Sequence, residues 1–278
     1  MLTAHIPQAY VYKSYAQHNF RQIPQVERFL TKEQITDIDV VSHVLPFKTN
    51  NYVIDELINW DQVPDDPIFT LTFPRKEMLT TTHYNTMLAV MKSGASKDEI
   101  KHVANNIRAE LNPHPAGQLE HNVPMIEGHK LTGMQHKYRE TVLFFPSQGQ
   151  TCHAYCSFCF RWPQFVGMDE WKFAMRETEL LIKYIKEHTE VTDLLFTGGD
   201  PMIMKNKIFG SYIDALLEAD IPNLQTIRIG TKALGYWPYK FLTDEDADDT
   251  LRTFEKIVKS GKNLAIMAHF NHPVELST

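Results

Sequence analysis

Short apolar runs and amphipathic stretches alternate along the second half of the chain, from about residue 141 onward. Each apolar run is rich in β-prone residues and is followed by a turn-forming or polar segment. These runs predict four strands, over residues 141–145, 191–196, 226–230 and 264–270.

The intervals between the runs show the apolar spacing of helices. The first helix is predicted over residues 169–188, and the third from Thr243, with Asp246 three residues on, to a stop at Gly261. The second helix places six apolar residues on one face: Ile208, Phe209, Tyr212, Ile213, Leu216 and Leu217. The third has four apolar residues at core spacing: Leu251, Phe254, Ile257 and Val258.

Repetition of strand and helix predicts an α/β fold with parallel strands joined by helical crossovers. In such folds the chemistry lies at the carboxyl ends of the strands. A cysteine cluster follows the first predicted strand, Gly198-Gly199-Asp200 follows the second, and His269 ends the fourth. The strand-to-strand intervals suit a barrel, and the chain stops eight residues after Phe270. We therefore expect about four βα units of a barrel that is incomplete at its C-terminus.

The first half of the chain, residues 1–141, is punctuated by proline and has an irregular pattern. One helix is predicted over residues 84–92, ending at Gly94. A second starts with Ser96 and Glu99 in capping-box spacing and ends near Leu111. We expect residues 1–141 to form a mainly helical and irregular cap and arm, and residues 142–278 to form the barrel domain.

Composition and charge exclude several classes of protein. The chain carries 28 basic and 34 acidic side chains, a formal charge of −6, whereas a nucleic-acid-binding surface needs an excess of Lys and Arg. It holds no apolar run of about 18 residues, so a membrane span is not expected. The N-terminal residues lack the apolar core of a signal peptide, which predicts a cytoplasmic protein.

All three cysteines, Cys152, Cys156 and Cys159, fall within eight consecutive positions. An odd, tightly spaced set without a secretion signal indicates a ligand set rather than a disulfide framework. Three thiolates on one loop can bind three irons of a [4Fe–4S] cluster and leave the fourth iron without a protein ligand. A zinc site with His153 or a distant histidine is one alternative, although zinc motifs usually pair two-ligand knuckles. Buried cysteines without a ligand are the other alternative.

The cysteine spacing, with Phe158 before the last cysteine and Gly198-Gly199-Asp200 after the second strand, resembles the radical S-adenosylmethionine (SAM) superfamily. Further stretches are similar to lysine 2,3-aminomutase and its relatives: residues 136–143, 160–161, 197–201, 227–230 and 269–273. The resemblance covers residues 130–278 and extends more weakly back to residues 64–67.

The resemblance implies that a reduced [4Fe–4S] cluster donates an electron to SAM. Cleavage then yields methionine and a 5′-deoxyadenosyl radical that abstracts hydrogen from the substrate. It implies that Phe158 lies against the adenine, Arg161 reaches the methionine carboxylate and His269 contacts the adenosyl group. Four residues match the stretch that receives the methionine amino group: Thr197, Gly198, Gly199 and Asp200. The alternatives are loop packing for Phe158, a surface role for Arg161, and a bond from His269 to Asn271 or to the backbone.

The family also uses pyridoxal 5′-phosphate (PLP), whose phosphate is held by two arginines just before the cluster. The matching positions in this chain are Lys137 and Thr141, and Arg139 lies close by as a substitute. Lysine offers a point charge without the bidentate fork of arginine, and threonine offers only a hydroxyl. The PLP-binding lysine of the family would lie beyond the last residue of this sequence, so PLP is implied by resemblance alone.

The function that the resemblance implies is 1,2-migration of an amino group on an amino acid, an isomerase reaction. Two alternatives stay open: a radical SAM enzyme of this family that acts without PLP on another substrate, and a non-catalytic iron–sulfur or zinc module. The expected partners are a small amino-acid substrate, a reductant such as flavodoxin or ferredoxin, and a second copy of the chain in a homo-oligomer. No catalytic residue beyond the cofactor contacts is assigned.

Overall fold

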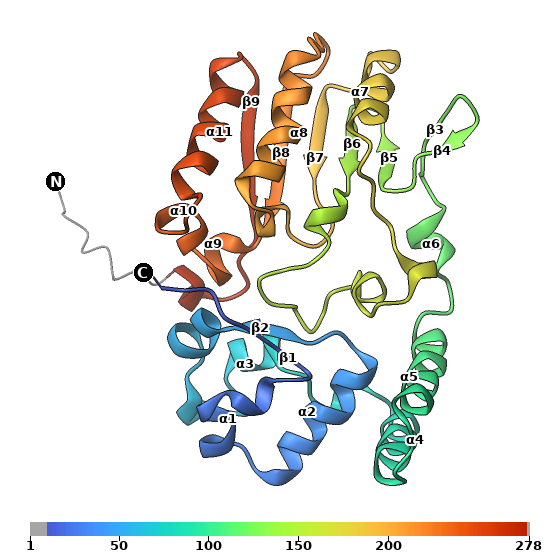
Figure 1. The fold of residues 1–278 in the computed structure, drawn as a ribbon, viewed down its shortest axis with the longest axis vertical. Coiled ribbons are helices and arrows are strands. Elements are labelled where there is room, and N and C mark those ends of the chain that lie inside the picture. Colours follow the sequence, from blue (N-terminus) through green and yellow to red (C-terminus); the bar gives the residue numbers. More distant parts are fainter. Residues whose placement is uncertain (1–9, 277–278) are drawn as a thin grey trace, which may run out of the picture. The chain divides into compact units, whose positions relative to one another are not determined.

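The computed structural model describes residues 10–276, and contacts between residues divide the chain into two compact units (Figure 1). Unit 1 comprises residues 10–11, Ala116–Cys152 and 173–276; unit 2 comprises Tyr12–Pro115 and His153–Lys172. The predicted domain boundary at residues 141/142 stays a prediction. None of the helices in residues 10–276 combines the length and the apolar character that a membrane crossing requires.

Unit 1 is built on a mixed sheet of five strands with the order β5-β6-β7-β8-β9. Neighbouring strands from β6 to β9 are parallel, whereas β5 pairs antiparallel with β6 at one edge. The four predicted strands are confirmed, and with them the α/β class; β5 was not predicted. The bounds are β5 Met134–Tyr138, β6 Thr141–Phe144, β7 Asp193–Phe196, β8 Thr226–Thr231 and β9 Asn263–Ala268.

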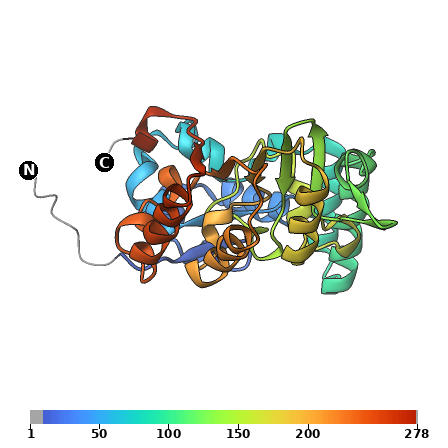
Figure 2. The ribbon, with the colours of Figure 1, turned by 90° about the horizontal axis from the view of Figure 1, so that it is seen from above.

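Three helices cover one face of this sheet (Figure 2). They are α7 (Thr178–Glu187), α8 (Asn206–Glu218) and α11 (Ala247–Lys259). Alternate strand residues point toward them and are fully buried, as the two-residue period of a strand requires: Val142, Phe144, Leu194, Phe196, Ile227 and Ile229. The core of unit 1 therefore lies between the sheet and these helices.

Two helix predictions in unit 1 need correction at their N-terminal ends. Helix α7 begins at Thr178, not at residue 169, because the preceding segment is extended and joins Pro146 through a parallel bridge at Met175. Helix α11 begins at Ala247, not at Thr243.

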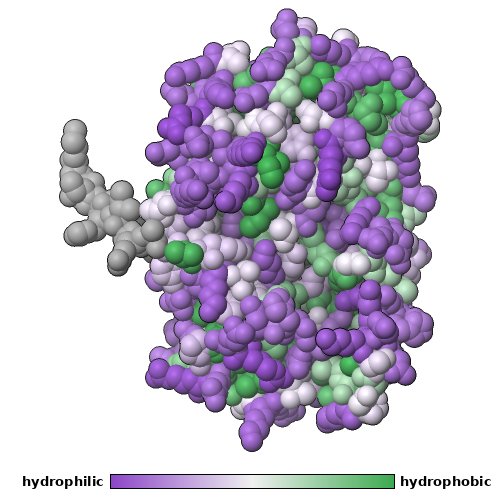
Figure 3. Space-filling model, in the orientation of Figure 1, coloured by the Kyte–Doolittle hydropathy of each residue, from purple (hydrophilic) through white to green (hydrophobic). Residues whose placement is uncertain are grey.

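The apolar face predicted for α11 is correct only in part. Ile257 is buried and Phe254 packs against the core, but Leu251 and Val258 are 47% and 58% exposed. Other exposed apolar residues are scattered, and Figure 3 shows a face that is mainly hydrophilic with small apolar patches.

The rest of unit 1 consists of short elements. They are α6 Ala116–Leu119, the antiparallel pair β3 Met125–Ile126 and β4 His129–Lys130, α9 Ala233–Tyr236 and α10 Tyr239–Leu242. Helices α9 and α10 follow β8 directly, so they lie next to the carboxyl end of a parallel strand.

Unit 2 is mainly helical, with one small antiparallel strand pair. Its elements are β1 Ser14–Ala16, α1 Pro24–Phe29, α2 Lys32–Val44, β2 Lys48–Asn50, α3 Pro67–Thr72, α4 Thr81–Lys92 and α5 Lys97–Leu111. The predicted helix pair is confirmed as α4 and α5. Helix α4 starts three residues earlier than predicted because Thr80 caps it, accepting a hydrogen bond from the His83 N–H. The predicted capping box of Ser96 and Glu99 is present.

A buried side chain joins α5 to the end of α2. Arg108 donates from its guanidinium to the backbone carbonyls of Val44 and His43, at 2.7 and 2.8 Å. These carbonyls belong to the last turn of α2, where helical partners are missing and positive charge is favoured. Arg108 thus fixes α5 against α2, and their apolar residues form the core of this part of unit 2.

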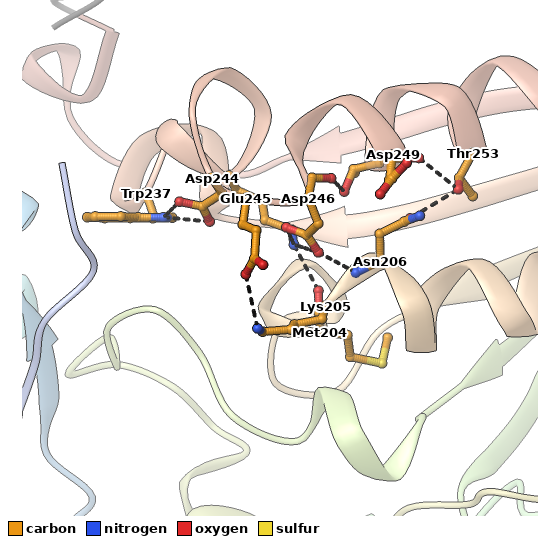
Figure 4. Close-up of polar contacts among 11 residues, drawn as sticks. Met204, Lys205, Asn206, Trp237, Asp244, Glu245, Asp246, Asp249 and Thr253 are labelled. Carbon is orange, nitrogen blue, oxygen red and sulfur yellow. Dashed lines mark hydrogen bonds and ion pairs between the residues drawn. The ribbon is translucent and has the colours of Figure 1, made fainter. Parts of the chain in front are cut away.

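A polar cluster connects the start of α8 with the loop before α11 (Figure 4). The Asp246 carboxylate accepts from the backbone N–H of Asn206, the first residue of α8, and from the ammonium of Lys240 at 3.0 and 3.1 Å. The same ammonium donates to the carbonyl of Met204 at 3.0 Å. Burial raises the pKa of Asp246, but the Asn206 N–H and the Lys240 charge outweigh it and hold the pKa below its usual range.

We expect Asp246→Asn to lower the free energy of unfolding by about 3 kcal/mol, because it leaves the buried Lys240 ammonium without its counter-charge. Only 5% of the Lys240 side chain is exposed. Since the folded pKa is lowered, the contribution of Asp246 is complete above the unfolded pKa of about 3.9 and is lost as the pH falls below it. Urea unfolding at pH 7 measures the difference, and the gap between variant and parent should close only under acid conditions.

The matched control is Asp249→Asn, in the first turn of α11, whose pair with Arg252 is more than half exposed on both sides. It should cost less than about 0.5 kcal/mol. Equal losses in the two variants would contradict a special role for the Asp246 cluster.

Candidate active site

The structure places three of the predicted site segments at one edge of the sheet in unit 1. Cys152 follows β6, residues 197–200 follow β7, and His269 follows β9 directly. Because β6 to β9 are parallel, these residues lie at the carboxyl ends of neighbouring strands.

Glycines after β7 bring the chain close to the stem of the cysteine loop. A Cβ on Gly199 would lie 2.5 Å from the backbone nitrogen and oxygen of Thr151, so only glycine fits. Gly198 has φ +125°, in the left-handed region that favours glycine. The Asp200 N–H donates to the Thr151 carbonyl at 2.7 Å. The Gly-Gly-Asp segment therefore holds the residue immediately before Cys152.

The Asp200 carboxylate is buried, 3% exposed, and is directed toward β8. It accepts from the Met202 N–H at 2.9 Å, from the Thr231 hydroxyl at 2.7 Å and from the Lys232 N–H at 2.9 Å. In the structure Asp200 therefore ties the ends of β7 and β8 together. Its predicted contact with the methionine amino group stays a prediction.

His269 lies at the end of β9 and is exposed. Its N–H donates to the Thr231 carbonyl at 3.0 Å, which continues the β8–β9 pairing beyond the strands. Partial burial and the Lys232 ammonium lower the pKa of the imidazole, and Glu275 opposes the shift. His269 is thus placed at the same edge as residues 197–200.

Cys156 and Cys159 lie on a turn in unit 2. The Cys159 N–H donates to the Cys156 carbonyl at 3.0 Å, and the Trp162 N–H donates to the Cys159 carbonyl at 3.1 Å. Two backbone bonds anchor the turn: Tyr155 N–H to the Lys48 carbonyl and Ser157 N–H to the Leu71 carbonyl, both 2.8 Å. The part of the cysteine loop that carries Cys156 and Cys159 therefore belongs to the unit 2 fold.

Arg161 lies beside Cys159, and each influences the other. Burial raises the pKa of the Cys159 thiol, whereas the Arg161 N–H and guanidinium lower it. Burial lowers the pKa of Arg161 to about 10, and the charge of Cys159 opposes that shift. Because cysteine binds metal as a thiolate, a guanidinium at this position favours the ligating form.

The aromatic residues of the loop are exposed. Phe158, predicted to lie against the adenine, is 53% exposed, and Phe160 is 70% exposed. The Arg161 guanidinium lies 5.2 Å from the centre of the Phe160 ring, a cation–π contact. A contact of Phe158 with a cofactor stays a prediction.

The boundary between the two units falls inside the cysteine motif, between Cys152 and His153. No disulfide joins the three cysteines, and each is partly exposed. Within residues 10–276, no group of three His, Cys, Asp or Glu side chains lies close enough to hold a metal ion. The three cysteines are thus divided between the two units, and their binding of a cluster stays a prediction. Their chemistry, three thiols on one short loop, fits an iron–sulfur cluster.

The predicted PLP-phosphate residues lie at the other edge of the sheet. Tyr138 pairs with Thr141, so Lys137 and Arg139 lie beside the amino end of β6, away from the cysteines that follow its carboxyl end. Both residues are exposed, and Arg139 comes within 3.9 Å of the Glu140 carboxylate. The structure does not bring them to the candidate site.

Thr141, the other predicted phosphate position, is already engaged. Its hydroxyl donates to the Asp193 carboxylate at 2.8 Å and accepts from Arg228 at 3.3 Å, and Arg228 also forms an ion pair with Asp193. This cluster lies on the sheet face opposite the covering helices. Sequence reasoning missed it, although the alternation of the strands places these polar residues opposite the core face.

Comparison with known proteins identifies the class to which this fold and site belong. No protein-family model matches the chain. The "Putative L-lysine 2,3-aminomutase" of Aquifex aeolicus (strain VF5) is 30% identical over 248 residues, 89% of this chain and 54% of that protein. L-lysine 2,3-aminomutase of Methanococcus maripaludis is 23% identical over 272 residues, 96% of this chain and 51% of that protein. Glutamate 2,3-aminomutase of Clostridioides difficile is 31% identical over 126 residues, 45% of this chain and 27% of that protein.

These similarities confirm the resemblance seen in the sequence. The chain belongs to the lysine 2,3-aminomutase family and, through it, to the radical SAM superfamily. It spans about half the length of the curated relatives that it matches along most of its own length.

Proposed function

We propose that the protein is a radical SAM enzyme of the aminomutase type that moves an amino group between adjacent carbons of an amino acid. Cys152, Cys156 and Cys159 would hold a [4Fe–4S] cluster through three irons. When bound, the cluster supplies one electron that breaks a carbon–sulfur bond of SAM and leaves methionine and a 5′-deoxyadenosyl radical. The relatives' names support the aminomutase reaction.

The observation that carries the proposal is the contact between Gly199-Asp200 and Thr151. It joins the end of β7 to the residue before Cys152 through the 2.7 Å bond and the close backbone approach. A Gly-Gly-Asp-Pro segment is ordinarily a simple turn, and one far from the cysteines would give no reason to propose a binding site. Its attachment to the stem of the cysteine loop supports a shared site for cluster and SAM. We propose in the same sense that β6 to β9 are four strands of a radical SAM barrel.

The chain's own residues would bind and orient SAM. Arg161 offers a guanidinium for the methionine carboxylate, a charge-assisted contact. The backbone of residues 197–199 offers carbonyl groups for the methionine amino group, since the Asp200 carboxylate is used by β8. Phe158 and His269 would contact the adenosyl part. Flavodoxin or ferredoxin would serve as reductant, in a cytoplasmic homo-oligomer.

The described residues do not fit PLP. Lys137 and Arg139 lie at the amino end of β6, and Thr141 is bound to Asp193 and Arg228. This placement favours a second candidate function, a radical SAM reaction on another substrate without PLP. The products that the reconstituted protein forms from SAM and an amino acid distinguish the two. Transfer of the amino group to the adjacent carbon only when PLP is added supports the aminomutase, and a SAM-dependent product formed without PLP supports the second candidate.

The test of the proposed function is anaerobic iron–sulfur reconstitution and electron paramagnetic resonance of the dithionite-reduced protein, with and without SAM. We expect a [4Fe–4S] signal that changes when SAM is added, and formation of 5′-deoxyadenosine. A protein that binds only zinc, or a cluster whose signal is indifferent to SAM, would contradict the proposal.

A further inference from the structure

A buried ion pair lies at the carboxyl edge of the sheet in unit 1. The Lys232 ammonium and the Glu275 carboxylate are 2.5 Å apart, and their side chains are 11% and 0% exposed. Lys232 follows β8 directly, and Glu275 lies in the turn after β9. The pair therefore joins the ends of two neighbouring strands.

Both partners also bind the backbone of the segment that follows β9. The second Glu275 oxygen accepts from the N–H groups of Asn271 and His272, at 3.0 and 3.1 Å. The Lys232 ammonium donates to the carbonyl of His269 at 3.3 Å. Residues 269–275 are thus folded back on the end of β8, with His269 at the start of this turn.

The same lysine is connected to the candidate SAM segment. Its backbone N–H donates to the Asp200 carboxylate, and the Asp200 N–H donates to the carbonyl of Thr151. A continuous series of hydrogen bonds therefore leads from the stem of the cysteine loop, through Asp200 and Lys232, to His269 and Glu275.

A glycine in α9 leaves space for the Glu275 carboxylate. A Cβ on Gly235, in α9, would lie 2.6 Å from a Glu275 oxygen, so a glycine is needed at this position. Buried ion pairs give little net stability over apolar residues of the same size, because both charges lose their water. In some proteins such a pair instead specifies one conformation of the groups around it.

We propose that Lys232 and Glu275 are the positioning pair of the SAM site, which fixes His269 and the end of β9 relative to residues 197–200. This inference rests on the proposed function, because it assumes that SAM binds at this edge. Neither side chain need touch SAM; Glu275 is fully covered and Lys232 nearly so.

The experiment measures SAM affinity by equilibrium dialysis of the reconstituted protein. Glu275→Gln and Lys232→Met should weaken SAM binding at least about tenfold, because each leaves a buried charge unpaired and releases the segment that the pair holds. Lys232→Arg keeps the charge and should recover most of the affinity. If Glu275→Gln does not fold, Gly235→Ala displaces the carboxylate with a smaller change and tests the same contact.

The matched controls are Lys240→Met and Asp246→Asn, which break a buried pair of the same kind among α8, α10 and α11. They should lower the thermal midpoint by a similar amount but leave SAM affinity within about twofold. If SAM binds the parent and both sets of variants equally well, the positioning role is wrong. Failure of the parent itself to bind SAM would instead refute the proposed function.

A second readout is independent of the cofactor. Nuclear magnetic resonance of the unreconstituted chain follows the titration of His269. Loss of the Glu275 charge should lower its pKa, and loss of the Lys232 charge should raise it, because the two charges act in opposite directions. If neither variant changes the titration of His269, the pair does not control this residue.

Discussion

Replacing Cys156 with serine is expected to abolish cluster formation. The parent should acquire about four iron atoms per chain after reconstitution, and the variant should lose iron by more than about tenfold, because even outer-shell changes at metal sites cost that much. A serine hydroxyl keeps its proton at neutral pH and lacks the soft sulfur that iron–sulfur clusters require. Iron analysis and the visible spectrum of the reconstituted protein measure the effect, and Cys152→Ser and Cys159→Ser should behave alike.

The control for this prediction is Ser157→Ala, in the same turn. The Ser157 hydroxyl donates to the Thr70 carbonyl at 3.0 Å, and alanine loses this hydrogen bond. The backbone N–H of residue 157, which donates to the Leu71 carbonyl and anchors the loop, is kept in the variant. The control should therefore retain the cluster. A cluster retained in any one of the three cysteine variants would show that that cysteine is not a ligand.

Truncating Phe196 to alanine should lower the free energy of unfolding by about 4 kcal/mol. Phe196 is fully buried at the end of β7 and meets three aromatic rings edge-on: Phe144 at 5.4 Å, Phe209 at 5.8 Å and Tyr212 at 6.3 Å. The cavity would open between β6, β7 and α8, where rigid strands prevent collapse. Urea unfolding monitored by circular dichroism measures the loss.

Leu251→Ala serves as the control for the core prediction. Leu251 has the helical spacing of a core residue but is 47% exposed on α11. It should cost less than about 1 kcal/mol. A loss as large as that of Phe196→Ala would mean that this face of α11 is covered in solution.

The strands and several helix ends could be predicted because their signals are local. The apolar, β-prone runs at residues 141–145 and 191–196 mark two of the strands, which bury one face through Val142, Phe144, Leu194 and Phe196. The capping box of Ser96 and Glu99 fixed the start of α5 within a single turn. The start of α11 could not be found in this way. Asp246 precedes the helix, but its carboxylate binds the first N–H of α8 and the Lys240 ammonium instead of capping α11.

The candidate site was predictable in its residue types but not in its contacts. The cysteine spacing and the Gly-Gly-Asp segment were visible, and both lie where a strand ends. That Asp200 would face Thr231 and Lys232 depends on pairing between β7 and β8, which no local pattern encodes. Lys232 and Glu275 were missed for the same reason. In the sequence each is an ordinary charged residue, and only the fold brings the two side chains together as a buried ion pair.

The order of the two units along the chain has a consequence for biosynthesis. Unit 2 is completed only when His153–Lys172 has been made, although its first segment ends at Pro115. At about 5 to 20 residues per second, several seconds separate the two events on the ribosome. During that interval the carbonyls of Lys48 and Leu71 lack the loop N–H donors that later bind them. Residues 153–172, which carry Cys156 and Cys159, are thus the last part of unit 2 to be synthesised, and a nascent chain that pauses before residue 172 lacks the two backbone hydrogen bonds that anchor the cysteine turn.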